Sequence, residues 1–489
     1  MSTRDHDTTP STTVTTSAPT APGEGSSRAS HTSRSPSRAK RVRIILAALL
    51  AAIIAIGGGG TVWWTLGGGA RTVALMRREP AEPATQTAID AVTGFAYRSA
   101  PGFLDAANGD DGNVNVNYSP TSMWMALALA AQGAGGATRT QLDETLGAKG
   151  LGDGDYTSLR SSVNGRYDDA RSVMDVHDSV WVDGRYTLKD SFRRAAQERF
   201  DADVESLAFD ARAEKRMSEW IEDNTHGMLK PDIRLNADTV MTIIDTVYAD
   251  GRWETPFEET NTEDRTFHGA SRERMVPMMA HTFDSMGYAQ AADGSWRRVS
   301  IPFDNGGALT VLLPAEGRFD EFSSDAARLE WAMSTCSARE TGGDAPTCSE
   351  KAGTDAAGNA VPEVEAASTS VDLKLPRFSI ENAFSPESAE KTLRALGVTD
   401  AFSQGTADFS GMLEPDGLPG NPFIGEIIQG TRIEVNEKGA KAAAFTQIQT
   451  EAAGAPIADK VTFDVDRPFL YELSTPDGVP LFIGAVRDL

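Results

Sequence analysis

Ser119 is the first residue whose surroundings could support nucleophilic chemistry. It lies in the sequence Ser-Pro-Thr-Ser, and six histidines and many carboxylates could nominally complete a hydrolase triad. A hydrolase serine is typically held in a Gly-x-Ser-x-Gly turn, which this motif lacks, and no histidine lies in a partner motif. Ser119 is therefore interpreted as a buried, hydrogen-bonded hydroxyl, and His226 and His268 as surface or hydrogen-bonded residues. Without a glycine-rich phosphate loop or a metal-ligand spacing, we expect no enzyme, no metal and no cofactor.

The segment 440–451 is the second candidate, because its residues alternate in type as those of a strand do. One set is small or β-branched and consists of Ala440, Ala442, Ala444, Thr446, Ile448 and Thr450. The other set, from Lys441 to Glu451, is largely polar or tolerant of solvent. This pattern predicts a strand with one buried and one exposed face. Gly439 precedes it and offers the backbone freedom that a hinge requires.

The elements around these residues indicate an α+β fold. The run 122–132 has helix-forming composition and is followed by glycines that would end a helix. The runs 308–313 and 463–473 are short, rich in β-formers and bounded by turn residues, as strands are. Helices come mostly first and strands mostly later, which favours α+β over a regular βαβ alternation.

Residues 337–368 interrupt this pattern with small and acidic side chains and are interpreted as a surface insertion. Cys336 and Cys348 are the only two cysteines, and they lie at and within this stretch. One local disulfide is the simplest arrangement if the body of the protein meets an oxidising environment. Two free thiols are the alternative.

The N-terminal region predicts a membrane anchor. Residues 1–43 form a basic tail whose composition indicates disorder, residues 44–66 are apolar and long enough to cross a bilayer, and residues 67–84 form a spacer. The charge distribution places the tail in the cytoplasm and the body outside the cell. A cleaved signal peptide, which would give a secreted protein, and a buried core helix are the alternatives.

The charge of the whole chain excludes one class of partner. The net charge is −24, and no long basic run follows residue 43. Because phosphate binding needs a concentrated Lys/Arg face, we expect no nucleic-acid ligand. The acidic body of the protein likewise disfavours an anionic polysaccharide activator of the heparin type.

An ordered set of motifs over residues 85–489 resembles the serpin family of protease inhibitors. The matches include Ser119-Pro120 with Ser122, Trp220 with Thr225 and Gly227, Val276-Pro277-Met278-Met279, Leu375-Pro376-Arg377-Phe378, Ala407-Asp408-Phe409-Ser410-Gly411, Val435-Asn436-Glu437-Lys438-Gly439, and Val465-Asp466-Arg467-Pro468-Phe469-Leu470-Tyr471. The resemblance implies a large central mixed sheet, two further sheets, about nine helices and an exposed reactive loop. It also implies a monomer that is consumed as a pseudo-substrate by a serine protease, and we expect a bacterial member of the family.

The resemblance assigns a role to two groups of residues. A hinge comprises Glu437, Gly439, Ala440, Ala442, Ala443 and Ala444, and its intact alanine run favours an inhibitor over a non-inhibitory serpin that binds or carries ligands. A polar cluster beneath the central sheet, called the shutter, comprises Ser119, Ser122, Asp245 and Gln429. Asp245 stands where the family has Asn, and Gln429 where it has His. A buried Asp needs donors and a Gln amide supplies two, so we expect Asp245 and Gln429 to pair.

The position of the reactive bond follows from counting along the loop. Counting forward from Glu437 by the family's spacing places it at Ala453–Gly454, whereas counting back from Pro468 places it near Ile457. The forward count is preferred because the inserting side must match the length of the sheet. Small residues around Ala453 offer no Arg, Lys or large aromatic side chain to a protease pocket. We therefore expect an elastase-like serine protease as the partner.

Overall fold

The computed structural model describes residues 83–106, 115–164, 172–236, 238–336, 348–384, 386–415, 420–425, 427, 429–440 and 460–489. Nine α-helices lie in these ranges. They are α3 (Gln86–Ala106), α4 (Pro120–Ala131), α5 (Gly136–Leu146), α6 (Asp153–Val163), α7 (Asp190–Phe200), α8 (Ala211–Asn224), α9 (Phe319–Ser323), α10 (Ala326–Ser334) and α11 (Pro386–Ala395). Two short 3-10 helices, η1 (Glu259–Asn261) and η2 (Asp400–Phe402), accompany them.

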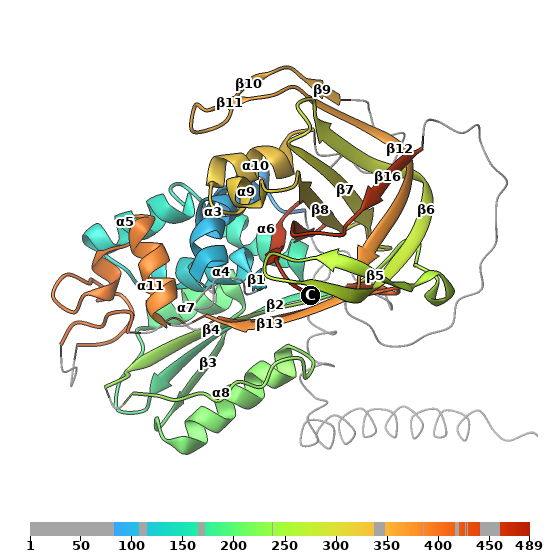
Figure 1. The fold of residues 1–489 in the computed structure, drawn as a ribbon. Coiled ribbons are helices and arrows are strands. Elements are labelled where there is room, and N and C mark those ends of the chain that lie inside the picture. The colour runs from blue at the N-terminus through green and yellow to red at the C-terminus, as the bar shows by residue number, and fades with distance from the viewer. Residues whose placement is uncertain are drawn as a thin grey trace, which may run out of the picture. The chain divides into compact units, whose positions relative to one another are not determined.

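The described strands form three sheets (Figure 1). The largest runs in the order β1 (Val116–Tyr118), β18 (Pro480–Val486), β17 (Phe469–Ser474), β8 (Ala308–Pro314), β7 (Trp296–Pro302), β6 (Glu273–Ala291), β12 (Val364–Pro376) and β16 (Val461–Asp464). Within it, β5 (Glu263–His268) pairs with β6, and β9 (Cys348–Glu350) pairs with β12. The smallest sheet joins β10 (Gly353–Thr354) to β11 (Ala360–Val361).

A six-stranded mixed sheet carries the hinge. Its order is β13 (Phe378–Ala383), β14 (Gly430–Asn436), β15 (Gly439–Ala440), β4 (Met241–Arg252), β2 (Val173–Asp183) and β3 (Asp203–Leu207). The short β15 pairs antiparallel with β14 on one side and with β4 on the other. Among the described strands no ladder joins β4 directly to β14, so β15 alone connects the two halves of this sheet.

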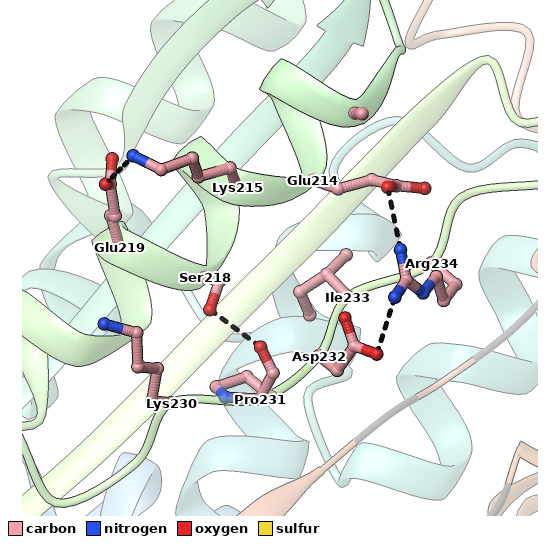
Figure 2. A pocket seen from close by; sticks show the side chains of 10 residues that line it. Glu214, Lys215, Ser218, Glu219, Lys230, Pro231, Asp232, Ile233 and Arg234 are labelled. Atoms are coloured by element: carbon pink, nitrogen blue, oxygen red, sulfur yellow. Dashed lines mark hydrogen bonds and ion pairs between the residues drawn. The ribbon is translucent and has the colours of Figure 1, made fainter.

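Helix α8 covers one face of the six-stranded sheet. Asp210 caps its N-terminus by accepting hydrogen bonds from the backbone of Arg212 and Ala213. The buried stripe of the helix includes Trp220, whose ring meets that of Trp181 on β2 at 6.5 Å between centroids. A pocket of about 280 Å³ lies between α8 and residues 230–234 (Figure 2).

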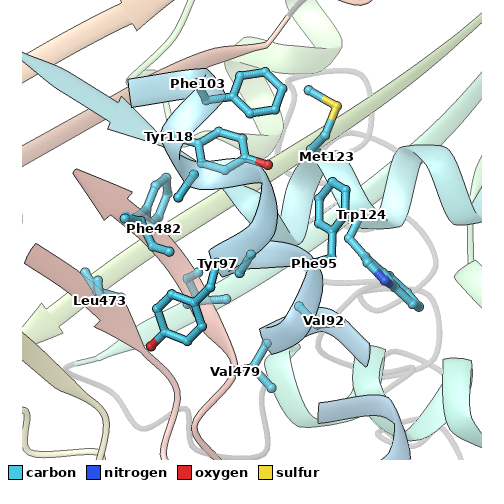
Figure 3. Close-up of a cluster of buried hydrophobic side chains, with 14 of the residues drawn as sticks. Val92, Phe95, Tyr97, Phe103, Tyr118, Met123, Trp124, Leu473, Val479 and Phe482 are labelled. Atoms are coloured by element: carbon cyan, nitrogen blue, oxygen red, sulfur yellow. The ribbon is translucent and has the colours of Figure 1, made fainter. Parts of the chain in front are cut away.

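Helix α4 lies inside the molecule and packs against β4 and β18. Ser119 caps it and Pro120 occupies its first turn, where a missing backbone N–H costs nothing. Its side chains are buried on nearly all sides, and Trp124 donates a hydrogen bond to the carbonyl of Leu146 at 2.9 Å. Figure 3 shows Trp124 among core side chains that include Phe95 and Phe482. This core fixes the position of the α4 N-terminus.

The structure refines two expectations about the later strands. The run 463–473 forms parts of two strands, β16 and β17, rather than one. They are separated by residues 465–468, which end in Pro468, a residue that cannot donate a ladder hydrogen bond. In the insertion, the described residues 348–368 form β9, β10, β11 and the start of β12, so this part is extended sheet rather than an irregular excursion.

The two cysteines are bridged, which decides between the alternatives left open by the sequence. Cys336 is disulfide-bonded, and Cys348 is the only other cysteine in the chain. The bridge links the end of α10 to β9, and β9 pairs with β12. It therefore ties both ends of the segment 337–347 to ordered elements.

The predicted single-pass membrane location is corrected here. Among the described residues, no helix is both long and apolar enough to cross a bilayer. The longest of them, α3, carries Asp90, Arg98 and Asp105 and packs against α4 and β18, so its apolar residues serve the core. The run 44–66 itself lies outside the described residues.

Candidate functional site

Glu437 anchors the turn between β14 and β15. Its carboxylate accepts hydrogen bonds from Arg377 Nε at 2.7 Å and from Thr262 Oγ1 at 2.5 Å, and its side chain is buried. Its backbone carbonyl accepts from the N–H of Phe257 at 2.9 Å. Burial alone would raise the pKa of Glu437, but the hydrogen bonds from Arg377 and Thr262 outweigh it and lower the pKa. Glu437 is therefore an ionised anchor at neutral pH.

Gly439 is required by close packing against β4. A Cβ atom at this position would lie 2.1 Å from the backbone oxygen of Gly251, a distance that no side chain can tolerate. The next residue, Ala440, is only 1% exposed, and it lies opposite Gly251 on β4 and Val435 on β14. The sequence predicted backbone freedom at Gly439, and the structure adds this steric reason. Ala440 has the buried orientation that the alternation predicts.

The other predicted loop residues lie outside the described part of the chain. These are the hinge residues Ala442, Ala443 and Ala444 and the reactive bond Ala453–Gly454. Their assigned roles therefore stay predictions. The described structure ends at Ala440 and resumes at Lys460, just before β16.

Ser119 and Gln429 meet at the N-terminus of α4. Gln429 Nε2 donates to the carbonyl of Ser119 at 2.8 Å, and the Ser119 N–H donates to Gln429 Oε1 at 3.2 Å. The Ser119 hydroxyl donates to the carbonyl of Leu481 at 2.8 Å. These bonds tie the start of β14 to α4 and to β18. Ser119 is thus the buried, hydrogen-bonded hydroxyl that the sequence predicted.

Asp245 does not form the expected hydrogen bond with Gln429. Neither of its carboxyl oxygens has a partner with hydrogen-bond geometry, because the Gln429 amide is engaged with the Ser119 backbone. The Ser122 hydroxyl lies near enough to lower the pKa of Asp245, though burial raises it more. Ser119, Ser122 and Gln429 therefore lie around the start of α4, and Asp245 lies near Ser122 and near a second residue on the adjacent strand.

That second residue is Asp178 on β2, which sequence reasoning missed. Asp178 and Asp245 are directly opposite in the antiparallel ladder of β2 and β4, and Asp178 is 3% exposed. Burial raises the pKa of Asp178 to about 7. The sequence contained a sign of this pair: Asp178 lies between Val176 and Val180 at strand spacing, which puts a carboxylate on the apolar face of the strand.

The pocket beside α8 offers little to a ligand. Its cations are already paired: Lys215 with Glu219 and Arg234 with Glu214 and Asp232 (Figure 2). Lys230 pairs with Glu222. An anionic ligand would have to displace these carboxylates, and an apolar one would find mostly charged walls. We assign no function to this pocket.

Comparison with known proteins decides the family. The family model for "Serpin (serine protease inhibitor)" matches residues 95–489. This chain belongs to the serpin family. Among curated relatives, Serpin-ZXA of Oryza sativa subsp. japonica is 29% identical over 412 residues, covering 81% of this chain and 95% of that protein. Glia-derived nexin of Rattus norvegicus is 27% identical, covering 76% and 87%.

Solved structures confirm the predicted serpin fold. The native state of the thermophilic serpin tengpin matches with a TM-score of 0.66 and 24% identity, covering 85% of this chain and 99% of that one. A thyroxine-binding globulin in complex with thyroxine matches with a TM-score of 0.62 and 19% identity, covering 82% and 98%. The two curated relatives above come from a plant and a mammal, so they do not support the expected bacterial source.

Proposed function

We propose that this serpin is a suicide inhibitor of serine proteases and that its cut loop inserts between β4 and β14. One observation carries the proposal: the last described residues before the loop, Gly439 and Ala440, already pair with both strands. These two residues form the short strand β15. Beyond Ala440, no described strand pairs with both β4 and β14. The protease attacks the loop, forms an acyl-enzyme, and is trapped when insertion outruns hydrolysis.

The register of β15 predicts where the inserted residues would lie. Continued along both strands, it places Ala442 between Ala249 and Ile433, on the same face as Ala440. Ile433 is 5% exposed, so this face belongs to the core. The small side chains of the even-numbered loop residues suit such a crowded position.

The opposite face of the inserted strand fits by charge. The same register places Lys441 between Asp250 on β4 and Glu434 on β14. A cation would then lie beside two carboxylates on adjacent strands, a favourable cross-strand arrangement. The small side chain of Ala442 on the buried face and the positive charge of Lys441 on the opposite face both support insertion of this segment.

The non-inhibitory alternative is a serpin that carries a small ligand. The structural similarity to thyroxine-binding globulin favours it, since that protein is seen with thyroxine. Against it stand the charged lining of the pocket beside α8 and the alanine run of the hinge. We therefore place inhibition first and an elastase-like protease as the target, with one copy of the chain consumed for each protease molecule.

The reactive bond can be tested by changing the residue on its acyl side. Ala453→Arg should convert the wild type, which we expect to form a complex with an elastase-like protease, into a variant that forms one with a trypsin-like protease. An Arg side chain matches the buried Asp of a trypsin-type pocket. The measurement is the amount of high-mass covalent complex on a denaturing gel.

Ile457→Arg is the matched control for that experiment. It places the same charge at the bond given by the backward count, so trypsin should cut it without being trapped. If Ile457→Arg traps trypsin and Ala453→Arg does not, the forward count is wrong. If the wild type is cut by every protease tested and never yields a high-mass band, the inhibitory proposal itself fails.

A further inference from the structure

Two aspartates face each other inside the six-stranded sheet. Asp178 and Asp245 are ladder partners on β2 and β4, and both oxygens of each carboxyl group are shielded from solvent. By distance and angle, none of these four oxygens accepts a hydrogen bond from the described residues, although the nearby Ser122 hydroxyl still lowers the pKa of Asp245. Buried carboxylates left in this condition are costly, because neither water nor protein replaces their lost hydration.

The surrounding elements supply little positive charge. From α4, the Ser122 hydroxyl approaches Asp245, and from α6, Arg160 acts on Asp178 from a distance while it pairs with Asp201 at 3.2 Å. From the segment before β14, Gln429 is engaged with Ser119. The other face of β2 carries the neighbouring titratable group, His177, whose charged surroundings are Asp175, Asp203, His226 and Asp201. No cation among these forms an ion pair with the two aspartates.

One proton resolves this arrangement. Two ionised carboxylates repel each other, and burial leaves no water to screen them, whereas a carboxylic acid donates to the carboxylate beside it. Directly opposite residues on neighbouring antiparallel strands have Cβ atoms about 4.5–5.5 Å apart, so the two side chains lie within reach of such a bond. We propose that Asp178 and Asp245 share one proton in the native sheet and that loss of this proton at rising pH loosens the contact of β2 and β4 with α4. The pair is thus a pH-sensitive latch on the half of the sheet that carries β4.

The sign of the effect follows from the direction of the shifts. Burial raises the pKa of Asp178 to about 7, and burial together with the Asp178 carboxyl raises the pKa of Asp245 well above its usual value. The native state therefore holds more protons than the unfolded chain, whose aspartates titrate near pH 4. The stabilisation from the shared proton is complete in acid. It decreases from about pH 4 upward and is lost as the pH passes through the native pKa values.

This latch has a consequence for inhibition, and that consequence rests on the proposed function. The inserting strand must fit between β4 and β14, and we expect β4 to move over α4 to admit it. Charge repulsion at Asp178 and Asp245 weakens the packing that opposes this movement. We expect loop insertion to become faster as the pH rises above neutral.

The test compares thermal unfolding across pH in the wild type and in Asp178→Asn. The Asn amide can donate to Asp245 at every pH, so it replaces the shared proton permanently. Between about pH 5 and pH 8 the unfolding midpoint of the wild type should fall by several degrees, and that of Asp178→Asn by less than half as much. Asp264→Asn, at an exposed position on β5, should keep the wild-type profile.

A second variant and an infrared measurement test the shared proton independently of Asp178→Asn unfolding. If Asp178→Asn does not fold, Asp245→Asn serves the same purpose, and the infrared band of a protonated carboxylic acid should be present in wild type at neutral pH and absent in the variant. Equal pH profiles in wild type and variant, or no protonated carboxyl band, would overturn the shared proton.

Insertion rates distinguish failure of the shared-proton proposal from failure of the proposed inhibitory function. The ratio of wild-type to Asp178→Asn insertion rates, measured with one protease, should rise severalfold over the same pH range; a ratio independent of pH would contradict the effect on insertion. If neither protein traps any protease, the inhibitory proposal fails, while the unfolding profiles still decide whether the proton is shared.

Discussion

Ala442→Arg should turn the inhibitor into a substrate. The register of β15 places residue 442 between Ala249 and Ile433 on the buried face of the sheet, beside the fully packed Ala440. Burying an unpaired guanidinium there costs about 3–5 kcal/mol. If half of that cost is present in the transition state for insertion, insertion slows about 10- to 70-fold. Hydrolysis of the acyl-enzyme then competes with insertion, and the number of cleaved inhibitor molecules released for each protease trapped should rise at least tenfold.

Ala443→Arg is the matched control for this prediction. The same register places residue 443 between Tyr248 and Arg432 on the opposite face, where Glu434 and Glu381 already pair with Arg432. An added Arg there finds carboxylates nearby and should be tolerated far better. If the two variants trap protease equally well, or fail equally, the assignment of faces is wrong, and so is the placement of the inserting strand.

Cleavage of the loop should raise the thermal stability of the wild type by a large margin. A new strand of about ten residues between β4 and β14 would form ladder hydrogen bonds on both sides, each worth about 1 kcal/mol net. For a domain of this size, that gain corresponds to an increase in the unfolding midpoint on the order of 10–20 °C. The measurement is calorimetry of intact and cleaved protein under identical conditions.

The control for the stability prediction is the cleaved Ala442→Arg variant. Because its inserted strand would bury the charge, its midpoint should rise less than that of the cleaved wild type. An unchanged midpoint after cleavage of the wild type would mean that the loop does not insert, whatever the variant does.

Much of the fold could be predicted from local patterns. The sequence Ser119-Pro120 marks the start of α4, because a side-chain cap followed by proline is a local signal. The strand at 308–313 was also confirmed as part of β8. In each case the information lies within a few residues of the element that it predicts.

The parts that could not be predicted depend on contacts between distant residues. Asp178 and Asp245 are ladder partners only because β2 and β4 pair in one particular register, and a slip of one residue would separate them. The engagement of Gln429 with the Ser119 backbone, rather than with Asp245, likewise depends on how β14 approaches α4. The steric need for Gly439 arises from the backbone of Gly251, which no local pattern reveals.

Amide hydrogen exchange on intact and cleaved protein tests the central claim most directly. Insertion predicts that residues 441–450 exchange rapidly in the intact protein and become strongly protected after cleavage. The amides of β4 and β14 that face the new strand should gain protection at the same time, while those of β17 and β18 in the other large sheet should not change. Rapid exchange of residues 441–450 in the cleaved protein would contradict insertion between β4 and β14, and with it the proposed mechanism of inhibition.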